Sequence, residues 1–180
     1  FQKNAFVRDF DAVVVGVGEA GVTLDRTAFY AGGGGQPCDF GTLAFGDATA
    51  VVNKVSRKDG EIVHELDGPP PEIGAQVHGV VDWDNRYALM RTHTALHILC
   101  GVIWRDFGAH VTGGNMTPLA GRMDFEFENM TADFAERVVA RGLTVVMPDL
   151  VGTPGKDVSL PYIMSSLAKV CISKEFTSWA

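Results

Sequence analysis

The sequence predicts an α+β protein: a small β-barrel domain over residues 1–83, followed by a domain of mixed helices and strands over residues 84–180. Two observations predict this order. The first part consists of short β-branched and aromatic runs separated by turn signals, with no helical pattern between them. After residue 83 the spacing of the apolar residues changes to that of an α-helix.

Six strands are expected in the first domain. GEAG separates the first two, and KDGE contains the Asp-Gly pair that favours positive φ angles, which predicts a hairpin between the fourth and the fifth. GPPPEIG is a rigid connector before the last strand. Short strands at this spacing favour a small barrel. The expected ranges are 11–17, 22–30, 42–46, 48–57, 61–66 and 75–83.

The second domain is expected to open with a long helix over residues 84–107, capped by Asp84 and ended by Gly108. Trp83 and Trp104 are expected to anchor the core. The helical face expected to be buried comprises positions 89, 93, 96, 97, 100, 103, 104 and 107. The later elements expected are a strand at 118–128, a helix at 131–142, a strand at 143–148 and a helix at 161–176.

Composition narrows the class of protein. The chain has 180 residues, of which 46% are hydrophobic and 21% charged, which is typical of a folded globular protein. No apolar run approaches the roughly 18–20 residues of a membrane helix, and we expect no secretory leader in the mixed, charged opening segment. Three widely spaced cysteines argue against a disulfide scaffold and favour the cytoplasm. The net charge of −7 means that a nucleic acid would have to meet a local basic patch. Candidates for that patch are Lys54, Arg57, Lys58, Arg86 and Arg91.

His93 and His97 are the first candidate functional residues. They lie at positions i and i+4 of the predicted helix, so both rings project from one face. Two core histidines bonded to the backbone are one interpretation. Two desolvated, neutral imidazoles that converge on one point are typical of a metal site, and zinc is its usual occupant. The glutamate of the H-E-x-x-H proteases is absent, and a zinc site would need at least one further ligand.

The second candidate is the glycine-rich stretch AGGGGQPCDFGTL, residues 31–43. Four successive glycines free the φ angle and allow a backbone to approach a ligand. A floppy connector is the alternative, but strand-like segments frame the stretch closely, so we predict a shaped loop. It is not a P-loop, because no G-K-[ST] follows, and a nucleoside triphosphate site is therefore disfavoured.

Four segments in order carry a resemblance: LDRTAFYAGGGGQPCDFGTL, VDWDNRYALMRTHTALHIL, HVTGG and GRMDFEFE. Together they resemble the trans-editing AlaX proteins and the editing domain of alanyl-tRNA synthetase. The resemblance implies a glycine-rich barrel followed by a two-layer α/β editing domain. It implies hydrolysis of mischarged tRNA-Ala, chiefly Ser-tRNA-Ala with Gly-tRNA-Ala as a further substrate, and zinc held by H-x-x-x-H and a later C-x-x-x-H.

The resemblance also implies roles for individual residues. His93 and His97 match the first ligand pair, and Thr112 matches a threonine that contacts the serine hydroxyl. His110 is a candidate catalytic or substrate-contacting residue beside it. The loop residues that match the family's glycine-rich motif, and that would help to present the tRNA end, are Gly33, Gly34, Gly35 and Gln36.

The end of the chain departs from the family. No CGGTH-like segment follows, and the editing domain looks shortened. Cys171 and Glu175, spaced C-x-x-x-E, are the replacement ligands that we predict; a small buried cysteine and a surface carboxylate are the alternative. Two other functions stay open. One is a truncated or divergent, non-catalytic family member that binds tRNA or a partner, and the other is a small-molecule zinc hydrolase on a similar scaffold.

Overall fold

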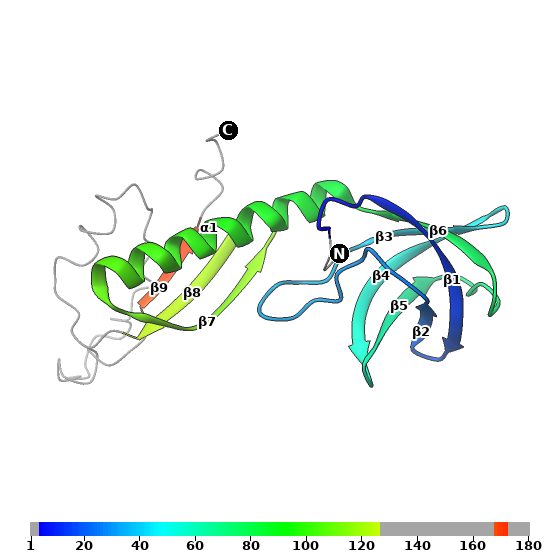
Figure 1. The fold of residues 1–180 in the computed structure, drawn as a ribbon, viewed down its shortest axis with the longest axis horizontal. Helices are drawn as coiled ribbons and strands as arrows, with labels where there is room; N and C mark the ends of the chain where they lie inside the picture. Colours follow the sequence, from blue (N-terminus) through cyan, green and yellow to red (C-terminus); the bar gives the residue numbers. More distant parts are fainter. Residues whose placement is uncertain (1–3, 127–167, 173–180) are drawn as a thin grey trace, which may run out of the picture. The chain divides into compact units, whose positions relative to one another are not determined.

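The structure, a computed structural model, describes residues 4–126 and 168–172 (Figure 1). The chain divides into two compact units, Phe1–Tyr87 and Ala88–Ala180. The described part contains nine strands and one helix, and its strands form a closed barrel and a three-stranded sheet. This arrangement is compatible with the predicted α+β class.

Six antiparallel strands close the barrel in the order β1-β2-β5-β4-β3-β6, so the small barrel predicted from the strand spacing is confirmed. The hairpin at KDGE is also confirmed, because Asp59 and Gly60 have φ angles of 50° and 88°. The strands are β1 (Asp9–Gly18), β2 (Gly21–Leu24), β3 (Gly41–Phe45), β4 (Ala48–Lys58), β5 (Glu61–Asp67) and β6 (Gln76–Val81).

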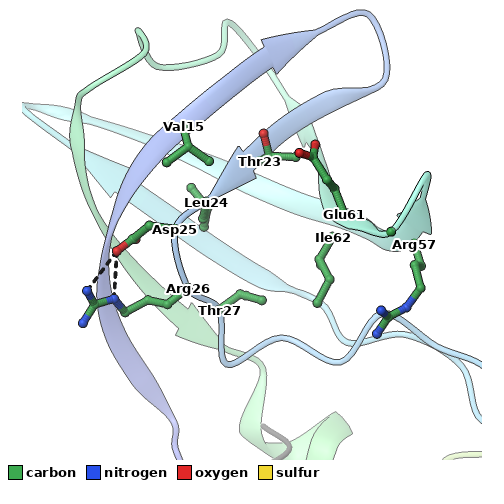
Figure 2. Close-up of a pocket in the computed structure, with 10 residues that line it drawn as sticks. Val15, Thr23, Leu24, Asp25, Arg26, Thr27, Arg57, Glu61 and Ile62 are labelled. Atoms are coloured by element: carbon green, nitrogen blue, oxygen red, sulfur yellow. Dashed lines mark hydrogen bonds and ion pairs between the residues drawn. The ribbon is translucent and has the colours of Figure 1, made fainter.

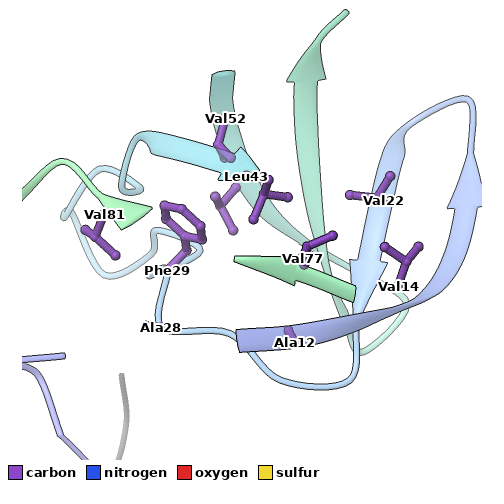
Figure 3. Packing of buried hydrophobic residues seen from close by; sticks show 10 residues of the cluster. Ala12, Val14, Val22, Ala28, Phe29, Leu43, Val52, Val77 and Val81 are labelled. Carbon is purple, nitrogen blue, oxygen red and sulfur yellow. The ribbon is translucent and has the colours of Figure 1, made fainter. Parts of the chain in front are cut away.

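The expected strand at 22–30 is wrong beyond Leu24. Asp25 turns the chain there: its N–H donates to the Val13 carbonyl at 3.0 Å, and its carboxylate accepts the Val13 N–H at 2.8 Å. The segment that follows carries Phe29 into the barrel, where it is fully buried among valine and leucine side chains (Figure 3). Gly41 lies against it, and a Cβ there would come within 2.1 Å of the Val80 carbonyl oxygen.

His64 is a polar member of this buried interior. Its Nδ1 lies 3.2 Å from the Val22 carbonyl and its Nε2 lies 2.9 Å from the Thr27 hydroxyl. A neutral ring that donates from Nδ1 and accepts at Nε2 satisfies both contacts. Burial lowers the pKa of His64, because the charged ring would lose its hydration.

Helix α1 (Trp83–Phe107) begins one residue before the predicted start. Asp82, not Asp84, provides the cap: its carboxylate accepts the Asn85 N–H at 3.1 Å. Asp84 lies in the first turn instead. Gly108 ends the helix as predicted, with φ of 65° and its N–H bonded to the Trp104 carbonyl at 2.9 Å. No helix in the described part of the chain is long and apolar enough to span a membrane.

The buried face of α1 is rotated from the predicted one. Leu96 and Ile103 are buried as expected, but His93, His97 and Trp104 are exposed. The predicted buried face included the two imidazoles together with the apolar residues, and it therefore lay closer to His93 and His97 than the observed one. The buried cluster comprises Leu89, Leu96, Leu99, Ile103, Ala109, Met116 and Phe125.

The second sheet has the order β7-β8-β9, from β7 (His110–Thr117), β8 (Ala120–Glu126) and β9 (Ala168–Ile172), all antiparallel. The strand expected at 118–128 is confirmed over residues 120–126, as β8, and residues 127 and 128 lie outside the described residues. The helix expected at 161–176 is wrong at 168–172, where the backbone pairs with β8. The helix expected at 131–142 and the strand expected at 143–148 lie outside the described residues.

Candidate functional site

His93 and His97 meet on successive turns of α1, as their spacing predicts. Their Nε2 atoms lie 3.0 Å apart and their rings stack with centroids 4.9 Å apart and an interplanar angle of 14°. Both residues are exposed in the structure, not buried. The reason is the position of the buried stripe, which passes through Leu96 and Leu99 and leaves the imidazoles beside it.

The pKa of His93 favours ligand chemistry. Partial burial, and then the neighbouring His97 ring, lower the pKa of His93. A lowered pKa keeps the imidazole neutral over a wider pH range, and a neutral imidazole has a lone pair for a metal ion or a proton. The pair therefore brings two ring nitrogens to one point, and the His93 ring favours the neutral form.

His110 contacts Trp104 in the described part of the chain: the two rings have centroids 4.4 Å apart at 52°. Trp104 is 53% exposed, so its expected role as a core anchor is wrong. Cys100 lies between the histidine pair and Trp104 on the helix, and burial raises the pKa of its thiol. A raised pKa favours the protonated thiol over the nucleophilic thiolate.

Thr112 lies in a β-bulge. Val111 pairs with Phe125 and Gly113 pairs with Asp124, so Thr112 is the extra residue of β7 and has no partner in the β7–β8 ladder. Its side chain is exposed. A bulge re-aims the side chain that it carries, and bulges are frequent next to binding sites. A threonine at this position is presented to solvent rather than packed in a strand face.

The β8 strand opposite this bulge carries a pair that sequence analysis did not single out. An Arg122 Nη2–H donates to Asp124 Oδ2 at 3.0 Å. Arg122 Nε and Asp124 Oδ1 are buried without a hydrogen-bond partner among the described residues. The i, i+2 spacing puts both side chains on one face of the strand, and this spacing could have indicated the pair from the sequence.

The glycine stretch forms a tight, defined turn. Gly33 and Gln36 exchange two backbone hydrogen bonds of 3.0 and 3.1 Å, and the Tyr30 hydroxyl donates to the Gly33 carbonyl at 2.8 Å. Gly34 and Gly35 between them have φ angles of 61° and 82°, which only glycine adopts easily. The shaped loop predicted from the sequence is confirmed.

A buried ion pair holds the base of this loop. Asp39 accepts the Tyr30 N–H and the Arg86 guanidinium, whose Nε lies 2.9 Å from Asp39 Oδ1. Arg86 also donates to the carbonyls of Ala5 and Ala28 at 2.8 and 2.7 Å. Arg86 is 3% exposed, so it does not contribute to a basic patch for RNA.

The first unit also has a pocket of ≈ 340 Å³ beside β2 (Figure 2). Apolar side chains such as Leu24 and Ile62 line it, and Asp25 and Arg26 form an ion pair at its edge, with Nη2 2.9 Å from Oδ2. The Val13 N–H lowers the pKa of Asp25. Of the residues predicted to act in catalysis or binding, Arg57, a candidate of the basic patch, lines this pocket; the predicted catalytic residues and metal ligands do not.

Comparison with known proteins identifies relatives of this chain. The family model "tRNA synthetases class II (A)" matches residues 3–85. The alanyl-tRNA editing protein AlaX-M of Saccharolobus solfataricus is 39% identical over 132 residues, 72% of this chain and 56% of that protein. The AlaX-M of Methanosarcina acetivorans is 40% identical over 143 residues, 74% of this chain and 58% of that protein.

The alanine–tRNA ligase of Pyrobaculum calidifontis is 46% identical over 112 residues, 62% of this chain and 12% of that enzyme. The chain is a relative of AlaX-type editing proteins. The resemblance predicted from the four motifs is thus confirmed. The chain spans a little over half the length of the AlaX-M proteins that it matches.

The remaining predicted ligands of this AlaX relative are only partly within the described residues. The backbone of Cys171 pairs with Arg122 in the β8–β9 ladder. Glu175 lies outside the described residues. The C-x-x-x-E replacement therefore stays a prediction.

The histidine pair fits two positions of a zinc site. Zinc binds imidazole nitrogens at about 2.0–2.1 Å in a tetrahedron, which puts two such nitrogens about 3.3 Å apart. The observed separation of the His93 and His97 Nε2 atoms is 3.0 Å. Among the side chains that the structure describes, no cluster of three or more metal-ligating residues is formed. Zinc at this pair stays a prediction.

Proposed function

We propose that this chain is a zinc-dependent aminoacyl-tRNA hydrolase that removes serine, and in addition glycine, from mischarged tRNA-Ala in the cytoplasm. The observation that carries the proposal is the His93–His97 pair, with facing Nε2 atoms on a chain related to alanyl-tRNA editing proteins. The relatives support an editing function at the level of the family, and the imidazole pair supports its chemistry.

In this proposal His93 and His97 hold the metal ion, and Cys171 and Glu175 complete its ligand set. Zinc, when bound, would act as a Lewis acid and lower the pKa of a bound water. The lowered pKa of His93 supports the role, because the ring stays neutral and keeps its lone pair for the ion. An aminoacyl ester is already activated, so the chain needs mainly to bind and orient it.

Thr112 senses the amino-acid side chain in this proposal. Its place in the bulge presents the hydroxyl to solvent, where it can exchange hydrogen bonds with the hydroxyl of serine. A site that hydrogen-bonds a hydroxyl can reject the analogue lacking one by up to about 10⁴–10⁵-fold. Alanine lacks that hydroxyl, so this contact favours the seryl ester over the correct product Ala-tRNA-Ala; glycine lacks it too, so the contact does not select the glycyl ester. His110 lies two residues away and is the second polar contact proposed for the substrate.

The turn at Gly33–Gln36 shapes the approach of the tRNA terminus in this proposal. Glycine at the two central positions leaves the backbone without side chains, and a bare backbone lets a sugar or phosphate approach closely. The hydrogen bonds that close the turn, and the Tyr30 contact below it, hold the backbone in this conformation before RNA arrives. The loop therefore binds without first having to become ordered.

Hydrolysis of Ser-tRNA-Ala by the purified chain tests the proposal. We expect release of serine with zinc supplied, loss of the activity with a chelator, and little release of alanine from Ala-tRNA-Ala. The role of His93 is tested with the variant His93→Ala. Its matched control is His78→Ala, because His78 is an exposed barrel histidine paired with Asp11. A folded, zinc-supplied chain that leaves Ser-tRNA-Ala intact would contradict the proposal.

A further inference from the structure

Three aromatic rings and one guanidinium gather in the first unit, where β1 and α1 begin. Trp83 and Tyr87 stack with centroids 5.8 Å apart at 20°, and Phe6 lies 6.1 Å from Trp83 at 44°. The Arg8 guanidinium lies 4.3 Å from the centroid of the Trp83 ring. These four residues are called the aromatic platform below.

The platform is open to solvent. Phe6 is 64% exposed and Tyr87 is 47% exposed. Trp83 is half-buried, so its expected role as a core anchor is only partly met. Single exposed apolar residues are common, but a contiguous cluster of exposed rings marks an interaction site. The barrel core does not need Phe6 or Tyr87, because its buried cluster is formed by other residues.

The platform carries the positive charge of Arg8. The ion pairs of the described residues do not include Arg8, and its guanidinium lies over the face of the Trp83 ring. A stacked guanidinium keeps its N–H groups directed outward in its plane. Asp9 follows Arg8 directly in the sequence, and Asp82, which precedes Trp83, caps helix α1. Asp84 in the first turn of α1 leaves the field mixed rather than strongly basic.

Flat exposed rings beside an arginine are the groups that bind unpaired bases. Bases stack on tyrosine, phenylalanine and tryptophan faces or on an arginine plane, with little dependence on sequence. A protein partner would also use such residues, but the match to the tRNA synthetase model spans residues 3–85, which include Phe6, Arg8 and Trp83. That match favours RNA as the occupant.

We propose that the aromatic platform binds unpaired nucleotides of an RNA by base stacking, with Phe6 and Tyr87 as the accessible rings and Arg8 and Trp83 as their support. This inference rests on the proposed function, because it assumes that the chain acts on tRNA. It extends that function by assigning a surface for single-stranded RNA that is distinct from the ester-hydrolysing residues.

Fluorescence anisotropy with a short, labelled, unstructured RNA tests the platform in the full chain. Tyr87→Ala and Phe6→Ala are each expected to weaken binding about 5-fold or more, as loss of one base stack does. Tyr87→Phe keeps the ring and is expected to bind as the unaltered chain does. Ile73→Ala is the control, because Ile73 is 66% exposed elsewhere on the same unit, and it is expected to have no effect. Circular dichroism establishes that each variant folds.

Several results would overturn the platform. The first is an affinity for duplex RNA equal to that for the unstructured RNA. The second is an affinity of the alanine variants for the unstructured RNA equal to that of the unaltered chain. The third is no RNA binding by the unaltered chain. A protein contact would appear as self-association that Phe6→Ala abolishes while RNA binding is unchanged. Serine release from Ser-tRNA-Ala, measured on the same preparation at saturating RNA, separates the two proposals. Hydrolysis without binding of unpaired RNA contradicts only the platform, and binding without hydrolysis contradicts only the proposed function.

Discussion

Helix α1 contributes residues to two polar pairs, one buried and one exposed. Arg86 is buried and its guanidinium is bonded to Asp39 and to two backbone carbonyls. Seven residues later His93 is exposed and faces His97. The buried pair has its hydrogen-bonding groups committed to the fold, whereas the exposed pair presents ring nitrogens to one another at the surface of the described part.

Within one helix, Arg86 therefore has a structural role, whereas His93 and His97 are candidates for a chemical one. A buried ion pair whose donors and acceptors are satisfied stabilises one arrangement and has little left for a ligand. The lowered pKa of His93 keeps its ring neutral over a wider pH range, and a neutral imidazole can bind a metal ion. Substitutions should therefore affect stability at Arg86 and activity at His93.

Arg86→Ala should lower the free energy of unfolding by about 3–5 kcal/mol, because it leaves the Asp39 carboxylate buried and unpaired. Urea unfolding measures this change. Arg26→Ala is the matched control: Arg26 is exposed and pairs with Asp25 at the surface, so little change is expected. If both variants unfold at the same urea concentration, the buried pair does not have the structural role assigned to it.

Gly34→Ala should destabilise the glycine turn by about 1–2 kcal/mol, because a residue with a Cβ is strained at a φ of 61°. Space is not the cause, since no atom lies within 4 Å of the added Cβ. Gly18→Ala is the control, as its Cβ is equally free and its φ lies outside the left-handed region. Thermal unfolding of the two variants should differ, and identical midpoints would argue against a fixed turn.

Much of the first unit was predictable from the sequence. Alternating apolar residues and Asp-Gly turns encode strands locally, so the barrel strands, except the part of the second expected beyond Leu24, and the hairpin at KDGE were predicted correctly. The Asp39–Arg86 pair was not predictable, because 47 residues separate the partners. The pairing depends on the closed fold, and the local sequence around Asp39 or Arg86 does not indicate it.

The second unit was harder to predict. The helix and its glycine end follow from local rules, but its buried face was shifted toward the histidines. β7 has the sequence HVTGGNMT, in which glycines and polar residues hide the strand pattern. It becomes a strand through its ladder with β8. The bulge at Thr112 arises from that pairing and could not be predicted from the local sequence.

Stability should fall as pH decreases below about 6.5, where the unfolded chain begins to protonate its histidines. Burial lowers the pKa of His64 in the folded state, so below that pH the unfolded state takes up a proton that the folded state resists. The loss is at most about 1.4 kcal/mol per pH unit for this residue. Urea unfolding from about pH 7.5 to about pH 5.5 measures it. His64→Gln should have a shallower dependence, and an equal slope would exclude His64 as the cause.

Thr112→Val should reduce the preference for seryl over alanyl esters by about 5- to 10-fold, the effect of one neutral hydrogen bond. The change keeps the size and β-branching of the side chain, so folding should be unaffected. Hydrolysis of Ser-tRNA-Ala and Ala-tRNA-Ala by the variant measures the ratio. Thr117→Val is the control, since Thr117 is exposed at the other end of β7. An unchanged ratio for Thr112→Val would remove Thr112 from substrate selection.

Zinc content is the most direct test of the central claim that the His93–His97 pair is a metal site. The purified chain, dialysed against a trace of zinc, should retain about one ion per molecule, and His93→Ala and His97→Ala should each lose it while remaining folded. His78→Ala should retain the ion. Equal zinc in all four proteins, or none in the unaltered chain, would contradict the claim.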